Sequence, residues 1–254
     1  GVMHYAKGEI VDTITTESDG VASSKELYLG KYEIREITAP HGMVLNGTIQ
    51  TVELTYAGQE VAITETAGNL YNERQKVKIS LSKVLEQNEL FGIGMNGELK
   101  NITFGLYAKT DLVAGDGTVI PAGGLIEIVT FDDNGMATVS ADLPLGSYYL
   151  QERSTDEHYI LDDTHYEFEF SYGSQETHMV EISVNGGDPI KNDLKYGMIS
   201  GRKVDEDGHV IAGAIFGLFR NDENEYTAEN AYLTAESAQD GTFKFEKVPF
   251  GTWI

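Results

Sequence analysis

The chain has no cysteine among its 254 residues, so neither a disulfide framework nor a thiolate metal site can stabilise it. Any covalent cross-link must therefore use other side chains. Proline is also scarce, with 5 residues, whereas glycine is frequent, with 28. Short runs of Tyr, Phe, Val, Ile and Thr alternate with clusters of Gly, Asn and Asp, which is typical of strands and turns. We expect helices to be a minor component.

Basic residues are also few. The sequence holds 18 basic and 41 acidic residues, and the net charge of -23 would repel phosphate backbones and anionic lipid. We therefore expect no nucleic-acid partner and no membrane partner. There is no apolar run of 18 residues, and we recognise no signal peptide or sorting tail, so the sequence looks like part of a longer protein.

Self-comparison reveals a repeat. Three glycine turns resume with an aromatic residue, and their glycines lie 116 and 105 residues apart: Leu29-Gly30-Lys31-Tyr32, Leu145-Gly146-Ser147-Tyr148 and Phe250-Gly251-Thr252-Trp253. After the first two turns, alternation places an aromatic, an aliphatic and an acidic side chain on one strand face: Tyr32, Ile34 and Glu36, and then Tyr148, Leu150 and Glu152.

Further markers recur in the same order. Asn72 and Asn192 each precede a strand that carries a lysine, Lys83 and Lys203 respectively, and a Phe-Gly-Leu strand follows each lysine. All markers occur together only in residues 76–196, so residues 1–75 are expected to be the back portion of one unit and residues 197–254 the front portion of another. Many short strands with regular turn signals predict an all-β protein of tandem immunoglobulin-like antiparallel sandwiches.

The repeated polar residues predict a reaction. Lys83 and Glu152 fall on the core-facing parity of their strands, and an unpaired buried charge costs several kcal/mol unless the group becomes neutral. A neutral lysine can attack the Asn192 carboxamide, expel ammonia and leave an isopeptide bond, with Glu152 polarising the carboxamide and relaying protons. Lysine and glutamate at a strand end are more often solvated, but their recurrence with asparagine favours the reactive interpretation. Lys76 and Lys78 have the opposite parity and are expected to be exposed.

Several segments resemble the Cna B-type and SpaA-like domains of Gram-positive pilins and adhesins. They are Ser82-Lys83-Val84, Gly201-Arg202-Lys203-Val204-Asp205-Glu206-Asp207-Gly208, Ala212-Gly213-Ala214-Ile215-Phe216 and Tyr32-Glu33-Ile34-Arg35-Glu36-Ile37-Thr38-Ala39-Pro40-His41-Gly42. The resemblance covers the whole chain. It implies that Lys83, Glu152 and Asn192 form an intradomain isopeptide bond, that Glu36 and Asn72 belong to an incomplete site, and that Lys203 belongs to another. It also implies a location on the bacterial cell wall surface. Residues 153–159 depart from the Thr-x-Ala-Pro-x-Gly-Tyr pattern of the family.

Other motifs are better explained as turns. Residues 92–97 satisfy G-x-G-x-x-G, but a strand follows where phosphate binding needs a helix. The acidic turns at 132–135 and 205–208 lack the spacing of a calcium loop. The six histidines have no metal-ligand spacing and there is no Gly-x-Ser-x-Gly elbow, so we expect no metal, no cofactor and no hydrolase.

Two functions remain open from the sequence. The first is a stalk or pilin-like segment that cross-links itself once and does not turn over. The second is an adhesive module that binds a host protein or glycan through an insertion at residues 111–124 or an exposed sheet edge. A glycosidase with paired carboxylates is a third and weaker interpretation, because no cleft is indicated. As partners we expect neighbouring domains of the parent protein and head-to-tail copies in which Lys203 meets Glu36 and Asn72.

Overall fold

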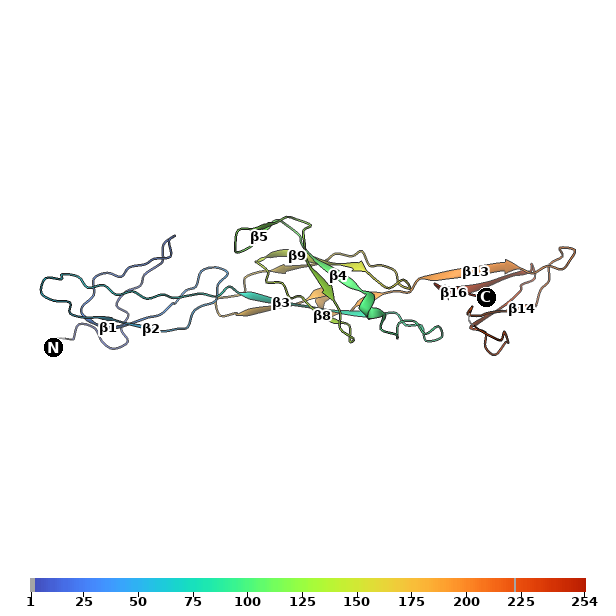
Figure 1. Cartoon of the computed structure of the whole chain (residues 1–254), viewed down its shortest axis with the longest axis horizontal. Helices are drawn as coiled ribbons and strands as arrows, with labels where there is room; N and C mark the ends of the chain where they lie inside the picture. The colour runs from blue at the N-terminus through green and yellow to red at the C-terminus, as the bar shows by residue number, and fades with distance from the viewer. Residues whose placement is uncertain (1–2, 222) are drawn as a thin grey trace. The chain divides into compact units, whose positions relative to one another are not determined.

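The computed structural model describes residues 3–221 and 223–254 (Figure 1). It divides into two compact units. The first contains Gly1–Gln75 and Ser174–His178, and the second contains Lys76–Gly173 and Met179–Ile254. The second unit therefore includes most of the expected middle domain, residues 76–196, and the segment that follows it. No helix of the described residues is long and apolar enough to cross a membrane.

The first unit contains one strand pair. Strands β1 (Gly30–Ile34) and β2 (Gln50–Leu54) are antiparallel, with Tyr32 opposite Val52. Side chains on β1 alternate between exposed and half-buried, and Glu36 continues the half-buried series, as the alternation predicts. Residues 70–72, which correspond to the strand that ends at Asn192, are irregular. In the second unit the corresponding residues pair with the lysine strand, and such a partner strand is what residues 70–72 would need to complete their backbone hydrogen bonds.

The second unit begins with a sandwich made by two four-stranded sheets. One has the order β10-β9-β4-β7, and in the other β3 lies between β11 and β12 and also pairs with β8. The strands are β3 (Lys76–Leu85), β4 (Thr103–Ala108), β7 (Leu125–Thr130), β8 (Met136–Thr138), β9 (Gly146–Ser154), β10 (Tyr166–Phe170), β11 (Met179–Ser183) and β12 (Ile190–Asn192). Two 3₁₀ turns, η1 (Glu98–Asn101) and η2 (Val184–Gly187), and a hairpin of β5 (Leu112–Val113) and β6 (Val119–Ile120) complete it.

A single hydrophobic core joins the two sheets of this β3–β12 sandwich. Ile79 and Leu81 of β3 pack in the same cluster as Phe104 and Leu106 of β4 and Leu150 of β9. Strands β3 and β9 place alternate residues inward, as the period-two pattern of their sequences predicts. The all-β class and the tandem sandwich organisation are confirmed.

Two strand pairings of the sandwich are parallel. Strand β3 pairs in parallel with β11 and with β12, and its partner at Lys83 is Ile190. The alternating pattern does not reveal strand direction, and only antiparallel pairing was expected. The parallel arrangement places the lysine strand directly beside the asparagine strand.

The segment after the sandwich repeats part of its structure. Strands β13 (Tyr196–Arg202) and β16 (Thr242–Pro249) form one antiparallel pair, and β14 (Ile215–Leu218) and β15 (Leu233–Glu236) form another (Figure 1). Leu218, Phe245 and Val248 make a small buried cluster.

Each of the three glycine turns contains the same kind of hydrogen bond. The side chain of the aromatic residue two positions after the glycine donates to the backbone carbonyl of the residue four positions before that aromatic residue. Tyr32 Oη donates to Tyr28 O at 2.6 Å, Tyr148 Oη to Pro144 O at 2.5 Å and Trp253 Nε1 to Pro249 O at 3.0 Å. The repeat recognised in the sequence is therefore also a repeat of local structure.

Candidate functional site: a buried lysine, glutamate and asparagine

Lys83 is held near the end of β3, on the face that carries Ile79 and Leu81. Its side chain has no exposed area, whereas Lys76 and Lys78 on the opposite face are exposed. The backbone N–H of Lys83 donates to Gly135 O at 2.7 Å, and a Cβ at Gly135 would lie only 2.2 Å from Lys83 O. Gly135 is therefore required for the turn to approach the lysine this closely.

Glu152 lies on β9 in the sheet that faces Lys83. It follows Tyr148 and Leu150 on the inward side of the strand, and its side chain is also fully buried. Its Oε1 lies 3.3 Å from Lys83 Nζ, and its Oε2 accepts the backbone N–H of Asp162 at 2.7 Å. The Phe104 ring centroid lies 5.4 Å from Lys83 Nζ and forms one apolar wall of the site.

Asn192 ends β12 and reaches the same carboxylate. Its Nδ2 donates to Glu152 Oε2 at 2.9 Å and to Ile160 O at 2.6 Å. A backbone carbonyl can only accept, so this contact fixes which end of the carboxamide is nitrogen. Glu152 thus contacts Lys83 with one oxygen and Asn192 with the other.

Three polar atoms of this site lack a hydrogen-bond partner among the described residues. They are Lys83 Nζ, Glu152 Oε1 and Asn192 Oδ1, all of them buried. The contact between the lysine and the glutamate is close, but it does not have hydrogen-bond geometry. Buried polar atoms are almost always satisfied in native proteins, so three orphaned atoms in one place require an explanation.

Burial governs the protonation of the site. Desolvation lowers the pKa of the Lys83 amine, and the negative charges of Glu152 and Asp162 oppose this shift only in part. The apolar surroundings therefore favour the neutral form of the Lys83 amine.

The first unit repeats the acceptor half of this site. Asn72 Nδ2 donates to Glu36 Oε2 at 2.6 Å and to Val44 O at 2.9 Å, while the Asn46 N–H donates to the same Glu36 oxygen at 2.6 Å. Val44 and Asn46 follow Glu36 by eight and ten residues, as Ile160 and Asp162 follow Glu152. Glu36 and Asn72 are half-buried, as they line the edge of the unit.

Lys203 repeats the donor half. Its backbone N–H donates to Gly241 O at 2.8 Å, as that of Lys83 does to Gly135 O, and a Cβ at Gly241 would lie 2.6 Å from Lys203 O. Its Nζ donates to Val204 O at 3.3 Å and the side chain is half-buried. The structure therefore brings Lys83, Glu152 and Asn192 together, pairs Glu36 with Asn72, and leaves Lys203 with neither an acidic nor an amide side chain among its described contacts.

Comparison with known families decides the classification. A family model described as the SpaA prealbumin-like fold domain matches residues 2–67, 93–185 and 197–254, which is most of the chain. The chain belongs to the SpaA family of prealbumin-like domains. A search of curated proteins found no match.

Solved structures that resemble this SpaA-type chain come from Gram-positive bacteria. The Bacillus anthracis TIE protein aligns with a TM-score of 0.64 at 21% identity, over 94% of this chain and 38% of that protein. A streptococcal ancillary pilin aligns at 0.32 and 20%, over 94% and 69%, and BcpA, the major pilin subunit of Bacillus cereus, at 0.33 and 15%, over 94% and 80%. This chain thus spans well under half of the TIE protein, and the likeness concerns the fold.

Sequence reasoning missed the backbone groups that surround the three candidate residues. Ile160 O accepts from Asn192, the Asp162 N–H donates to Glu152, and Gly135 O accepts from Lys83. The two units do share a spacing that could have indicated these groups, because in each unit the residues eight and ten positions after the glutamate supply the backbone contacts. The expected departure at residues 153–159 leaves the turn intact: Tyr159 N donates to Asp156 O at 3.0 Å, as Met43 N does to Pro40 O, and the Tyr159 ring is fully buried.

The remaining sequence motifs of this SpaA-type chain have structural roles. The glycine-rich segment 92–97 lies between β3 and η1, where Glu98 accepts the N–H groups of Gly94 and Asn96 at 2.9 and 2.7 Å. Asp132 and Asp205 close their turns by accepting backbone N–H groups. Within residues 3–221 and 223–254, no group of three potential ligands could hold a metal ion.

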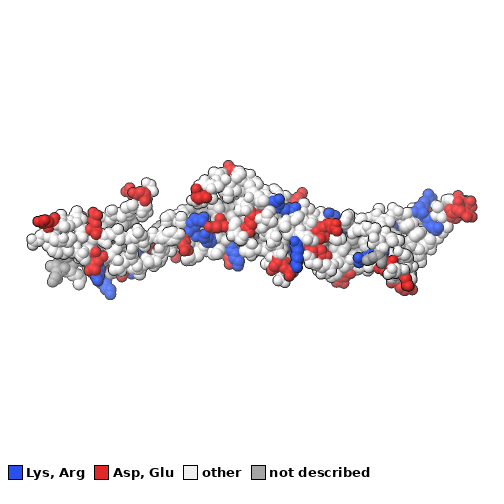
Figure 2. Space-filling model, viewed as in Figure 1, with Lys and Arg blue, Asp and Glu red and all other residues white. Residues whose placement is uncertain are grey.

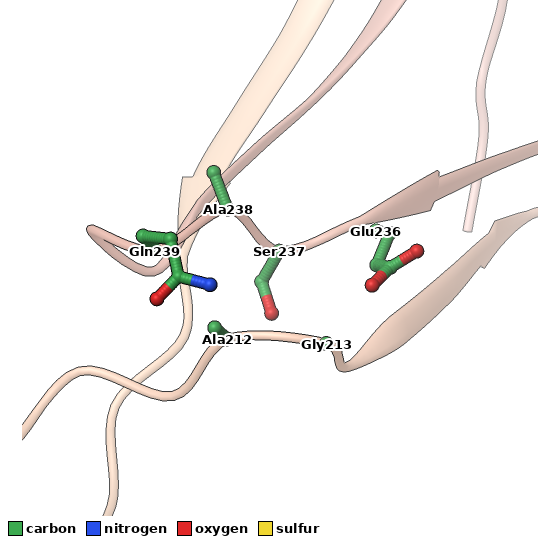
Figure 3. Close-up of a pocket in the computed structure, with 6 residues that line it drawn as sticks. All are labelled: Ala212, Gly213, Glu236, Ser237, Ala238 and Gln239. Carbon is green, nitrogen blue, oxygen red and sulfur yellow. The ribbon is translucent and has the colours of Figure 1, made fainter.

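One hollow lies in the segment after the sandwich. It is lined by small and polar residues, namely Ala212, Gly213, Glu236, Ser237, Ala238 and Gln239 (Figure 3). Ser237 is occupied in holding the local backbone, because its Oγ accepts the Ala214 N–H at 2.9 Å. On the face drawn in Figure 2, Lys and Arg side chains lie scattered among Asp and Glu side chains rather than gathered in one patch.

Proposed function

We propose that this chain is a structural stalk or pilin-like segment of a Gram-positive cell-surface protein, and that residues 76–196 form a domain locked by a Lys83–Asn192 isopeptide bond. The observation that carries the proposal is the position of Glu152, which contacts the amine with one oxygen and the carboxamide nitrogen with the other, inside a core that excludes water. The family supports an extracellular location.

The reaction balances without any added reagent. Neutral Lys83 Nζ attacks Asn192 Cγ and forms the new C–N bond, while its proton passes to Glu152 Oε1. Glu152 Oε2 gives a proton to Asn192 Nδ2, the old C–N bond breaks and ammonia leaves. Because Glu152 contacts the nitrogen of the carboxamide, its main role is protonation of the leaving group rather than polarisation of the carbonyl oxygen.

The product suits a load-bearing segment. The bond joins β3 to β12, two neighbouring parallel strands, so the chain between them becomes a closed covalent loop. Such a loop cannot extend when the chain is pulled or unfolded. The reaction occurs once per molecule, requires no cofactor and makes the protein its own product rather than an enzyme.

Peptide mapping tests this proposal. Protease digestion of the purified protein should yield one branched peptide that contains both Lys83 and Asn192. Recovery of these residues in two separate linear peptides would contradict the proposal. The peptide that contains Lys100 is a useful internal control, because the Lys100 side chain is exposed and its peptide should be linear.

The acceptor pair of the first unit supports a proposal about partners. Glu36 and Asn72 already have the three hydrogen bonds of the acceptor half. The place beside Asn72 corresponds to the place that β3 occupies beside Asn192. We propose that a lysine-bearing strand docks there, either from the parent protein or from a second copy through Lys203. If copies join covalently, boiled samples on a denaturing gel should show a ladder that disappears in Lys203→Ala. A single monomer band excludes covalent closure between copies, and a monomeric mass in native light scattering excludes their association.

An adhesive role is a second candidate. The insertion expected at residues 111–124 forms the β5–β6 hairpin, and its two facing valines, Val113 and Val119, are both more than half exposed. If this hairpin contacts a host protein or glycan, Val113→Ser/Val119→Ser should abolish binding to host matrix without changing the melting temperature. Equal binding by the two proteins would exclude the hairpin as the adhesive surface.

A further inference from the structure

The first unit contains a segment that is remote in the sequence. Residues Ser174–His178 belong to it although the chain on both sides of them belongs to the second unit. Thr177 N donates to Ser174 O at 3.0 Å, so the segment forms a closed turn. The turn is hydrogen-bonded to Ala39 and Leu45, which follow Glu36 in the chain, and to Gln75, which follows Asn72.

Gln175 joins the two limbs of the loop that follows Glu36. Its Oε1 accepts the Ala39 N–H at 3.0 Å on the outgoing limb, and its backbone oxygen accepts the Leu45 N–H at 2.8 Å on the returning limb. Leu45 lies between Val44, whose carbonyl accepts from Asn72, and Asn46, whose N–H donates to Glu36. One residue therefore fixes the spacing between the carboxylate and the backbone groups that orient the carboxamide.

Gln75 closes the arrangement from the Asn72 side. It is only 3% exposed, and its Nε2 donates to Ser174 O at 3.2 Å and to Thr177 O at 2.7 Å. Its own N–H donates to Gly42 O at 2.9 Å, inside the same loop. Residues 36–46, 72–75 and 174–177 are thus tied to one another by hydrogen bonds.

Comparison with the second unit shows which of these contacts occur only in the first unit. Lys195 corresponds to Gln75, and its N–H donates to His158 O at 2.7 Å, as that of Gln75 does to Gly42 O. The Lys195 side chain, however, is exposed and carries a charge that suits water. The backbone contact is common to both units, whereas the buried glutamine and the turn that it binds belong to the first.

We propose that the turn Ser174–His178 is a clamp that holds the Glu36–Asn72 pair in its acceptor arrangement, with Gln175 as the positioning residue. The inference rests on the proposed role of that pair as a cross-linking site. It has a consequence for the order of assembly. The acceptor pair of the first unit reaches its final geometry only after residue 178 has been synthesised, about a hundred residues after Asn72, and so after most of the β3–β12 sandwich exists.

Amide hydrogen exchange of the full chain by NMR tests the clamp directly. The Asn46 N–H reports on the first unit, and the equivalent Asp162 N–H on the second serves as an internal reference. Gln175→Met keeps the length of the side chain but removes its hydrogen bonds with the Ala39 N–H and with Ile37 O. Exchange at Ala39 and Asn46 should therefore quicken at least about threefold, the smallest effect expected for losing a hydrogen bond, while Asp162 stays unchanged. Gln175→Glu keeps an acceptor for Ala39 and should restore slow exchange.

A second variant approaches the clamp from its other side. Gln75→Leu has similar volume but cannot donate to Ser174 or Thr177, and it should quicken exchange at Asn46 as well. Unchanged exchange at Asn46 in both variants, or equal quickening at Asn46 and Asp162, would overturn the clamp. Neither outcome depends on Lys83, so a failure here is distinct from a failure to find the Lys83–Asn192 bond.

Discussion

Glu152 Oε1 lies 3.3 Å from Lys83 Nζ at a point where neither side chain has any exposed area. An ion pair buried this deeply costs more in desolvation than it returns unless its remaining polar atoms are satisfied, and here they are not. The arrangement is therefore a poor stabilising contact. It is explained if the two groups meet in order to exchange a proton in a reaction that consumes the lysine amine.

Replacing Glu152 by Gln should stop the reaction. The amide keeps the shape of the side chain but cannot take a proton from Lys83 or give one to Asn192. The variant should therefore retain the ammonia that the native protein loses and should unfold at lower temperature. The lost cross-link spans roughly a hundred residues, which is worth about 4 to 5 kcal/mol in the chain-entropy model.

A matched control is Glu169→Gln on the neighbouring strand β10, where the side chain is exposed. It changes the net charge by the same amount and should alter neither the mass deficit nor the melting temperature. If both variants behave alike, Glu152 has no special role.

Gly135→Ala should disturb the site through the backbone. Gly135 has a φ of 74°, and its new Cβ would meet Lys83 O at 2.2 Å, so β3 must shift next to the reactive lysine. Gly117→Ala is the matched control, because its φ is 84° but nothing lies within 4 Å of the new Cβ. Both should lose about 1 kcal/mol to the left-handed backbone, and only Gly135→Ala should lose more and form less cross-link. Chemical denaturation and intact mass measure the two effects, and equal losses would contradict the close approach.

The stability of an unreacted variant should depend on pH in a defined direction. Asn192→Ala removes the electrophile and leaves Lys83 as a free buried amine, whose pKa is lowered by desolvation while the unfolded chain keeps the ordinary value of 10.5. Between these two values the unfolded state binds a proton that the folded state does not. The free energy of unfolding should therefore rise with pH across that window and level off above 10.5.

Subtracting the curve of Lys83→Met/Asn192→Ala isolates this contribution from other titrating groups. The free energy of unfolding of the double variant minus that of Asn192→Ala should decrease as the pH rises. A difference that is constant, or that grows with pH, would show that Lys83 is protonated in the folded protein throughout.

Much of the site was accessible from the sequence because strand periodicity reports burial directly. Lys83 and Glu152 share the parity of Ile79 and Leu150, and this parity, together with their recurrence beside an asparagine, predicted that they enter the core while Lys76 does not. The recurrence of the glycine turn predicted the repeat, and the same i to i−4 hydrogen bond in all three turns gives it a physical basis.

Other features could not be read from residue types. Ile160 and Val44 act through backbone carbonyls, which every residue possesses, so their identity carries little information. The parallel pairing of β3 with β12 depends on chain direction, to which a period-two pattern is blind. The role of Gln175 depends on a contact across 136 residues with Ala39.

The central claim is tested most directly by the intact mass of the purified, unmodified protein. A Lys83–Asn192 bond predicts a mass below that of the translated sequence by one ammonia, and full recovery of the translated mass in Lys83→Ala and in Asn192→Ala once each substitution is allowed for. A wild-type mass equal to that of the translated sequence would contradict the account.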